Sequence, residues 1–333
     1  MITIDVRKLI SFGKGSFIVS MPKSWIEKNN LKKGDLISVD DEGFELILKA
    51  GNEENKVDSK ETTIDAKNKN LEALKTEIVS SYLNGYDTIN ILFDSNSKDV
   101  PKIKDIIRNL SGLEIMEQTS TRITAKNLIN VNEISISTII RRMDIITRAM
   151  MEDSILCSTG QCNCESIMNR DIDVNRLYFL GSRVIKNAMN TPRVARSLGI
   201  NTWKLHSDAF TILRIERIAD SQKKIARYIS SITIDRASIN ELSRIHTDMS
   251  EAYNNVMKAY YNNDKVIALK IEVAYRDRKA ACDRFLEKFT QSHSNTKSKT
   301  TYSSLVMVAK IIENLKATSR ETRNIARAIL CYE

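Results

Sequence analysis

The sequence has few of the residues that interrupt helices, with three prolines and ten glycines in 333 residues. Such a chain is expected to form long uninterrupted helices over most of its length. It also has no run of eighteen apolar residues and no N-terminal signal of charged and then apolar residues. We therefore expect neither insertion into a membrane nor secretion, and the odd number of five cysteines is typical of a cytoplasmic protein.

The residue patterns of common enzymes are missing too. The three histidines, His206, His246 and His293, are scattered, and no Ser-His-Asp or Cys-His arrangement stands out. The sequence contains no Gly-x-x-x-x-Gly-Lys-Ser/Thr loop for nucleotide phosphates. These absences predict that the protein is not an enzyme.

The sequence does have a globular composition with a basic excess. Hydrophobic residues make up 42% and charged residues 28% of the chain, and the formal net charge is +9. A chain of this length can form two or three domains. Its net positive charge favours encounter with polyanions, among them nucleic acids.

Hydrophobic periodicity divides the chain into four regions. Residues 1–50 alternate like strands, around a short helix that begins after Pro22. Residues 51–70 are polar and are interpreted as a linker, and residues 71–130 alternate between helical and strand patterns, as in a small α/β connector. From residue 131 to residue 333 the period is 3.6, which predicts helices throughout.

The helical region contains an internal repeat. The tetrapeptide Lys224–Arg227 recurs as Asn324–Arg327 one hundred residues later, near the end of the third helix of each half. We therefore expect two three-helix units, at 131–232 and 236–333. Apolar residues at helical spacing predict the core, which on the second helix includes Val174, Leu177, Gly181, Val184 and Ala188. The expected fold class is multidomain and mainly α.

The first 34 residues are strongly basic. Asp5 and Glu27 are the only acidic residues before Gly34, against seven basic ones: Arg7, Lys8, Lys14, Lys23, Lys28, Lys32 and Lys33. A unit of about forty-five residues is marginal for an independent core. We therefore expect an obligate homodimer, in which two basic surfaces combine to bind duplex DNA. On charge alone, the solvated face of a small β-barrel is the alternative interpretation.

Two segments of this region resemble a known family. Arg7–Trp25 and Leu31–Asp35 contain a Gly-x-Gly-Ser turn, a Pro-Lys-x-Trp helix start and a Leu-x-x-Gly-Asp turn, in that order. They resemble the AbrB/SpoVT swapped-hairpin module, in which two chains interlace hairpins into one β-barrel whose basic face contacts DNA. The resemblance implies such a barrel at residues 1–50, for DNA binding and dimerisation. By position, it implies that DNA is contacted by Arg7, Lys8, Lys14, Ser16 and Lys23.

The helical region is similar to a second family. Ile140–Met143, Met150–Asp153, Asp171–Leu180 and Leu213–Asp220 resemble segments of the PhoU family of phosphate-signalling proteins. The resemblance covers residues 132–333 and implies two three-helix bundles that modulate phosphate uptake. The α/β stretch before it looks like the connector of archaeal PhoU proteins with an AbrB-type head. Many PhoU proteins bind clusters of metal ions through paired acidic motifs.

The first half of the helical region offers candidate metal ligands. Glu216 and Asp220 lie four residues apart and share a helical face, and Asp171 occupies the corresponding flank of the preceding helix. These three carboxylates are candidates to bind a divalent metal such as Fe, Zn or Ni. The alternative is a solvated acidic flank that pairs with neighbouring Arg217 or Lys224.

The sequence departs from the family pattern near these positions. Asn175 stands where the resemblance predicts an aspartate, and the residues one hundred positions after Glu216 and Asp220 are Lys316 and Arg320, which cannot bind a metal. We therefore expect no metal cluster in the second half. A basic face there, with Lys316, Arg320 and Arg323, could attract a phosphorylated ligand or an acidic partner helix, or could simply be solvated.

Three cysteines close together form another candidate site. Cys157, Cys162 and Cys164 lie within eight residues near a helix end, where they could hold zinc or form a redox pair. Their spacing fits no standard zinc template, no histidine lies near, and a fourth ligand is missing. We therefore prefer the interpretation that these three cysteines have no functional role.

The sequence leads to two hypotheses of different classes. The first is a cytoplasmic, DNA-binding transcriptional regulator of phosphate uptake and phosphate homeostasis, with the helical domain as sensor or partner-binding module. The alternative is an adaptor that restrains a phosphate transporter, through its ATPase subunit, or a signalling kinase by protein contact, without DNA binding. A metal store on the helical surface is a third and weaker hypothesis.

Overall fold

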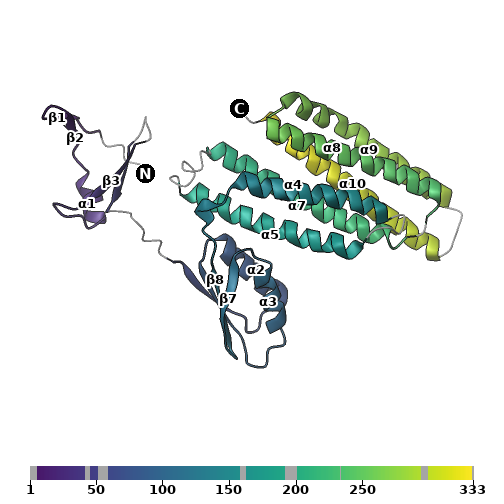
Figure 1. The fold of residues 1–333 in the computed structure, drawn as a ribbon, viewed down its shortest axis with the longest axis horizontal. Coiled ribbons are helices and arrows are strands. Elements are labelled where there is room, and N and C mark those ends of the chain that lie inside the picture. The colour runs from purple at the N-terminus through teal and green to yellow at the C-terminus, as the bar shows by residue number, and fades with distance from the viewer. Residues whose placement is uncertain are drawn as a thin grey trace. The chain divides into compact units, whose positions relative to one another are not determined.

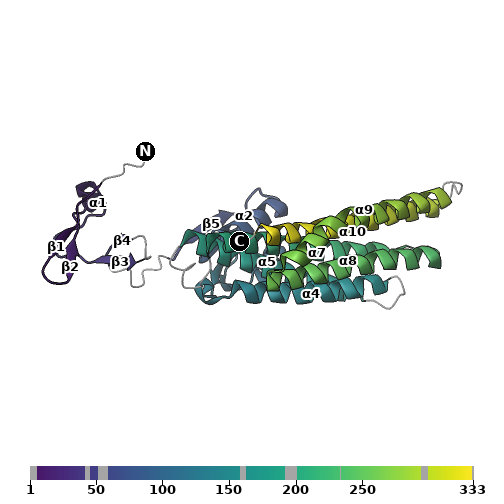
Figure 2. The same ribbon diagram turned by 90° about the horizontal axis from the view of Figure 1, so that it is seen from above.

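A computed structural model of the chain describes residues 6–41, 46–51, 59–157, 163–191, 201–232, 234–293 and 299–331. The chain divides into two compact units, residues 1–58 and residues 59–333 (Figure 1, Figure 2). Among the described helices, none combines the length and the apolar character needed to cross a lipid bilayer.

The N-terminal unit consists of two antiparallel hairpins and a short helix. Its elements, in chain order, are β1 (Ile10–Phe12), β2 (Ser16–Ile18), α1 (Lys23–Lys28), β3 (Ile37–Asp41) and β4 (Leu46–Ala50). β1 pairs with β2 and β3 pairs with β4, which confirms the predicted order of strands and helix. Gly13 forms the first hairpin turn with a φ of +69°, a conformation that glycine adopts without strain.

The second unit begins with a small α/β part. Its elements, in chain order, are β5 (Glu61–Asp65), α2 (Leu71–Leu83), β6 (Thr88–Leu92), α3 (Val100–Arg108), β7 (Leu113–Gln118) and β8 (Arg122–Asn127). The strand order is β5-β6-β8-β7, in which β5 and β6 are parallel and the other neighbours antiparallel. Alternate strand residues, among them Ile89, Ile91 and Ile123, share a core with Ile78 of α2 and Ile107 of α3.

The structure differs from the sequence prediction at residues 51–70, which the sequence predicts to be a linker. Residues 61–65 of this stretch form β5 at the edge of the sheet. Ile64 is the one side chain of β5 that is buried, so the apolar signal of this strand is too weak to stand out among polar neighbours. Residues 52–58 of the same stretch lie outside the described residues.

Long helices form the rest of the second unit and lie side by side in both views (Figure 1, Figure 2). After a short 3-10 turn, η1 (Val131–Glu133), they are α4 (Ile136–Leu156), α5 (Cys164–Asn190), α7 (Thr202–Ile229), α8 (Arg236–Asn262), α9 (Lys265–His293) and α10 (Lys299–Leu330). α4, α5 and α7 pack together, as do α8, α9 and α10. Because α7 also packs along α10, the two halves share one hydrophobic core.

The core face predicted for α5 is buried from Val174 to Ala188. Gly181 lies on this face, where α5 approaches α4 and α7 closely. A Cβ atom at this glycine would lie 3.2 Å from the Ile212 side chain and 3.3 Å from the Ile139 side chain. Glycine therefore allows these helices to pack at a distance that a larger residue would increase.

A buried arginine joins the α/β part to the helices. Arg183 of α5 is 3% exposed and donates hydrogen bonds to the backbone carbonyls of Tyr82 (2.6 Å) and Tyr86 (3.0 Å). Its guanidinium also contacts the Asp87 carboxylate at 3.3 Å and lies 4.8 Å from the centre of the Tyr82 ring. Phe179, one turn earlier on α5, packs against the α/β core. These contacts fix the sheet and its helices to α5.

A cluster of buried polar side chains lies where the two helical halves meet. Nε2 of His246 on α8 is 3.0 Å from Ser154 Oγ on α4 and 2.9 Å from Gln222 Oε1 on α7. The amide of Gln222 donates to Thr318 of α10 at 3.0 Å. All four side chains are at most 2% exposed. Since every bond joins different helices, the cluster sets the register of α4, α7, α8 and α10.

We expect the protonation of His246 to destabilise the fold. Burial lowers the pKa of this imidazole from 6.5 to about 4. Below its unfolded pKa the unfolded chain binds a proton that the folded chain does not, so stability falls as the pH decreases from about 6.5 to about 4. The expected loss is about 2 kcal/mol at pH ~5 relative to pH ~8.

The measurement is urea unfolding at the two pH values, for the native protein and for His246→Gln. Glutamine keeps a hydrogen-bonding group near Ser154 and Gln222 but does not titrate, so the variant should lose less stability at low pH. An equal loss in both proteins would contradict the assignment of this pH dependence to His246.

Candidate functional site

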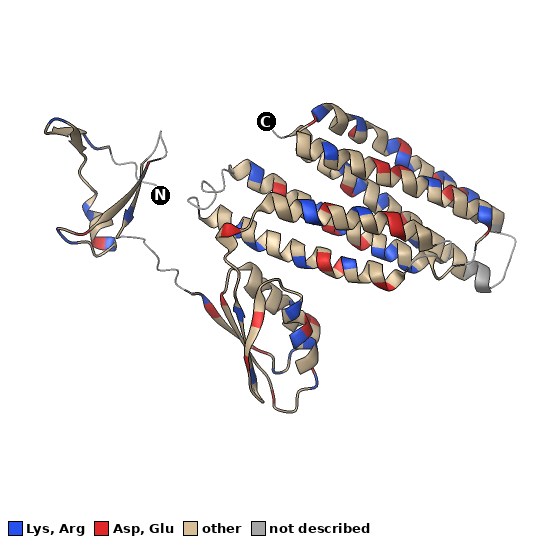
Figure 3. Ribbon diagram, in the orientation of Figure 1, with Lys and Arg blue, Asp and Glu red and all other residues tan. Residues whose placement is uncertain are grey.

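The five residues predicted to contact DNA are exposed in the N-terminal unit. Figure 3 marks the lysine and arginine positions of this unit in blue along the ribbon. They lie before β1, in the β1–β2 turn, at the start of β2 and at the start of α1: Arg7, Lys8, Lys14, Ser16 and Lys23. Lys23 forms an ion pair with Glu27 at 3.6 Å, in which both side chains are largely exposed. Such a pair contributes little and leaves the ammonium group accessible to a phosphate.

The apolar side chains of the same unit are exposed as well. Leu9, Phe12 and Phe17 are 68%, 65% and 68% exposed, and Leu36 and Leu46 are more than half exposed. Among the described residues of the N-terminal unit, no side chain is buried. The hairpins of one chain therefore present the residues of a core without enclosing one.

Two of the three predicted metal ligands, Asp171 and Asp220, meet at a lysine, and Glu216 lies within electrostatic range of them. Lys223 of α7 donates to the Asp171 carboxylate of α5 at 2.7 Å and contacts the Asp220 carboxylate at 2.9 Å. Lys224 contacts Asp220 from the other side at 2.5 Å, as the alternative interpretation of an ion-paired acidic flank predicts. Burial and the negative charges of Asp220 and Asp171 raise the pKa of the Glu216 carboxyl. The Glu216 carboxyl therefore interacts electrostatically with the other two.

These residues do not fit a bound metal ion as they stand. The ammonium group of Lys223 already bridges two of the three carboxylates, and Asn175 donates its amide proton to Asp171 at 3.2 Å. Among the residues that the structure describes, no group of three His, Cys, Asp or Glu side chains has the geometry of a metal site. Lys223 is not among the predicted site residues, although its place three residues after Asp220 signals an ion pair.

The basic face predicted in the second half consists of ion pairs. Lys316 contacts Asp283 at 2.5 Å, and Arg320 contacts Glu321 at 3.4 Å. Arg323 and Arg327 both bind the Glu272 carboxylate and hold its pKa near 2. Each of these four cations therefore contacts a carboxylate, although Arg323 and Arg327 share one.

The cysteine cluster is described only in part. Cys157, at the end of α4, and Cys164, at the start of α5, bring their sulfur atoms to 3.8 Å from each other. Cys162 lies outside the described residues. The structure thus places two of the three predicted residues side by side.

Comparison with known proteins finds similarities for both units of the chain. Residues 10–55 match the family model of MazE, the bacterial antitoxin of antidote-toxin recognition. The structure is similar to the crystal structure of PhoU from Pseudomonas aeruginosa, with a TM-score of 0.50 and 13% identity, over 59% of this chain and 93% of that chain. No curated protein matches the chain.

These findings confirm both resemblances seen in the sequence, an AbrB/MazE-like N-terminal segment and a PhoU-like helical fold. The match to the MazE model spans the two hairpins and the short helix of the N-terminal unit. The likeness to PhoU concerns the fold alone. The interlaced barrel and the residues that contact DNA stay predictions.

The acidic cluster generates a testable prediction. Lys223→Met should lower the free energy of unfolding by about 2 kcal/mol near neutral pH, because it leaves the buried Asp171 without its cation. Lys224→Met, which removes only the more exposed contact to Asp220, should cost less than about 1 kcal/mol. Added Ni²⁺ should raise the unfolding midpoint of Lys223→Met but not of the native protein, measured by urea denaturation. Stabilisation of both proteins alike would show that Lys223 does not compete with a divalent ion.

Proposed function

We propose that the protein is a DNA-binding transcriptional regulator of phosphate uptake and phosphate homeostasis. In this proposal two chains join their N-terminal units into one DNA-binding β-barrel, and the PhoU-like helices act as the sensor or partner-binding module. The observation that carries the proposal is that the N-terminal unit exposes strand-borne apolar residues and basic residues together.

The exposed apolar residues support dimerisation. Leu9, Phe12 and Phe17 lie in or next to the first hairpin and are each about two-thirds exposed. Burying a side chain of this size contributes roughly 1.5–3 kcal/mol, so two copies of the unit gain a core that one copy lacks. A small unit of this kind needs such a partner, because it is too short to bury enough surface alone.

The basic residues support DNA as the ligand. Four exposed basic residues belong to the N-terminal unit: Arg7, Lys8, Lys14 and Lys23. A twofold axis would place two such sets beside one another, which matches the two strands of a duplex. Lysine and arginine neutralise phosphates and release counterions, and arginine can also form two hydrogen bonds with a guanine edge.

The fold of the helices supports the link to phosphate. The helical part shares its fold with PhoU of P. aeruginosa, and the family resemblance of the sequence implies a role in phosphate signalling.

The alternative function is an adaptor that contacts a transporter subunit or a kinase. It is favoured by the groove between α7 and α10, which is lined by Trp203, Phe210 and Arg327, because the indole of Trp203 is 48% exposed there.

The dimer can be tested with a single substitution. Phe17→Asp should convert the full-length protein from dimer to monomer, because it places a charge in the apolar contact between the N-terminal units. Light scattering after size-exclusion chromatography measures the mass. Leu128→Asp is the matched control, since Leu128 is 59% exposed in the other unit, and it should leave the dimer intact. A native protein that is monomeric would refute the proposal.

DNA binding can be tested with a set of charge removals. The triple variant Arg7→Ala, Lys8→Ala, Lys23→Ala should bind a phosphate-transporter promoter fragment more weakly. The slope of log affinity against log salt should become shallower by about 0.9 for each DNA phosphate that the variant no longer neutralises. The control triple Lys75→Ala, Arg108→Ala, Lys102→Ala removes the same charge from exposed residues of the α/β part and should bind like the native protein. Binding is measured by fluorescence anisotropy over a salt series. Absence of DNA binding by a dimeric native protein would favour the adaptor.

A further inference from the structure

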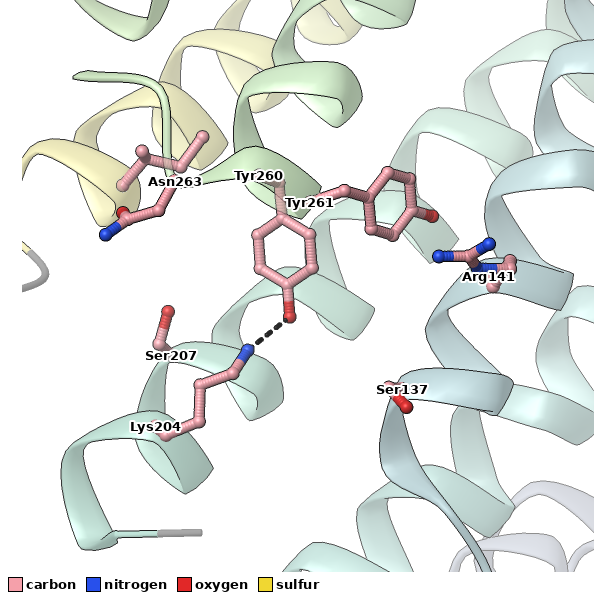
Figure 4. Close-up of a pocket in the computed structure, with 8 residues that line it drawn as sticks. Ser137, Arg141, Lys204, Ser207, Tyr260, Tyr261 and Asn263 are labelled. Atoms are coloured by element: carbon pink, nitrogen blue, oxygen red, sulfur yellow. Dashed lines mark hydrogen bonds between the residues drawn. The ribbon is translucent and has the colours of Figure 1, made fainter. Parts of the chain in front are cut away.

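A cavity opens at one end of the helical bundle, where α4 and α7 begin and α8 ends (Figure 4). Its volume is about 340 Å³. The residues that line it include two cations, two tyrosines and two serines: Arg141, Lys204, Tyr260, Tyr261, Ser137 and Ser207. It lies apart from the acidic cluster of Asp171, Glu216 and Asp220, none of which lines it.

Arg141 supplies a positive charge that the described part of the protein does not match. Its side chain is exposed, and its guanidinium lies 5.0 Å from the centre of the Tyr261 ring. No ion pair joins Arg141 to a carboxylate among the described residues. Stacking on the ring holds the guanidinium in place and leaves its N–H groups able to bind an anion.

Lys204 is the second cation of the cavity. Its ammonium donates to the buried Asp208 carboxylate and to the Tyr260 hydroxyl, the latter at 2.9 Å (Figure 4). The Tyr260 hydroxyl in turn donates to Asp208. An ammonium group has three protons, so Lys204 retains one for a ligand in the cavity.

The charges around the cavity leave an excess of one positive charge. Asp208 matches Lys204, while Asp144 accepts two bonds from Arg148, at 2.8 and 3.0 Å, and one from the Tyr261 hydroxyl at 2.9 Å. Of these five charged side chains, Arg141 is the one that has no ion pair with a carboxylate among the described residues. The hydroxyl of Ser137, in the first turn of α4, adds a polar group at a helix end that itself favours anions.

We infer that this cavity binds the phosphoryl group of a small phosphorylated molecule. Arg141, Lys204 and the Ser137 and Ser207 hydroxyls supply the donors for the phosphoryl oxygens. The cavity is at the lower end of the size of small-molecule sites, and exceeds what one inorganic phosphate ion fills. The tyrosine rings offer contact area to the organic part of such a ligand. This inference goes beyond the proposed function, because it requires neither DNA nor the N-terminal unit.

Isothermal titration calorimetry of the full-length protein tests the site with three probes: adenosine monophosphate, adenosine and inorganic phosphate. The native protein should bind the monophosphate saturably and should not bind adenosine. Arg141→Gln should weaken that binding about tenfold or more, since it removes a charge-assisted contact. Arg142→Gln is the matched control, because Arg142 is the next exposed arginine of α4 and does not line the cavity.

The outcomes separate the sources of the phosphoryl group and can overturn the inference. If the monophosphate binds more tightly than inorganic phosphate, the ligand is a phosphate ester. If the two bind equally and Arg141→Gln weakens both, the ligand is free phosphate. Both outcomes support the site. Failure of the native protein to bind either phosphate compound overturns it. So does equal weakening by Arg141→Gln and Arg142→Gln, which would indicate attraction by net charge alone.

Discussion

The packing of α7 along α10 is the contact on which the second unit depends, because it joins two three-helix halves into one core. This contact also includes buried polar side chains. Gln222 is hydrogen-bonded to Thr318, and His246 and Ser154 lie within hydrogen-bonding distance of Gln222. Apolar packing alone tolerates a shift of one helix along another. Buried hydrogen bonds do not, since a shift would leave each polar group without its partner. The cluster therefore specifies one register of the halves at the cost of sensitivity to acid.

The N-terminal unit differs from the helices in how it places its apolar side chains. The helices enclose their apolar residues within one chain, whereas the hairpins leave theirs exposed, as Phe12 and Phe17 show. If two copies of the hairpins pair as proposed, the stability of the N-terminal unit depends on protein concentration, whereas a core enclosed within one chain does not require a second copy. A regulator assembled in this way would bind DNA only as well as it dimerises, so expression level and affinity would be linked.

Much of this fold could be predicted from sequence because the helices are long and strongly periodic, as the buried face from Val174 to Ala188 shows. β5 could not, since a strand with one buried residue has no clear period. The carboxylates of the acidic cluster could be predicted from their spacing along single helices. The bridging position of Lys223 depends on how α5 and α7 meet, and the cavity beside Arg141 depends on where the ends of α4, α7 and α8 meet. Neither juxtaposition is encoded in local sequence.

The buried side chain of Arg183 has a mechanical consequence. Two carbonyl bonds and a stacked ring attach the end of α2 and the loop before β6 to the C-terminal part of α5, more strongly than a surface ion pair would. We therefore expect the α/β part to move together with α5, because Arg183 could leave its place only by losing both carbonyl bonds and its contact with Asp87. β5 is where the polypeptide enters the second unit from the hairpins. The chain therefore passes from the hairpins to the long helices through a part that is anchored to α5.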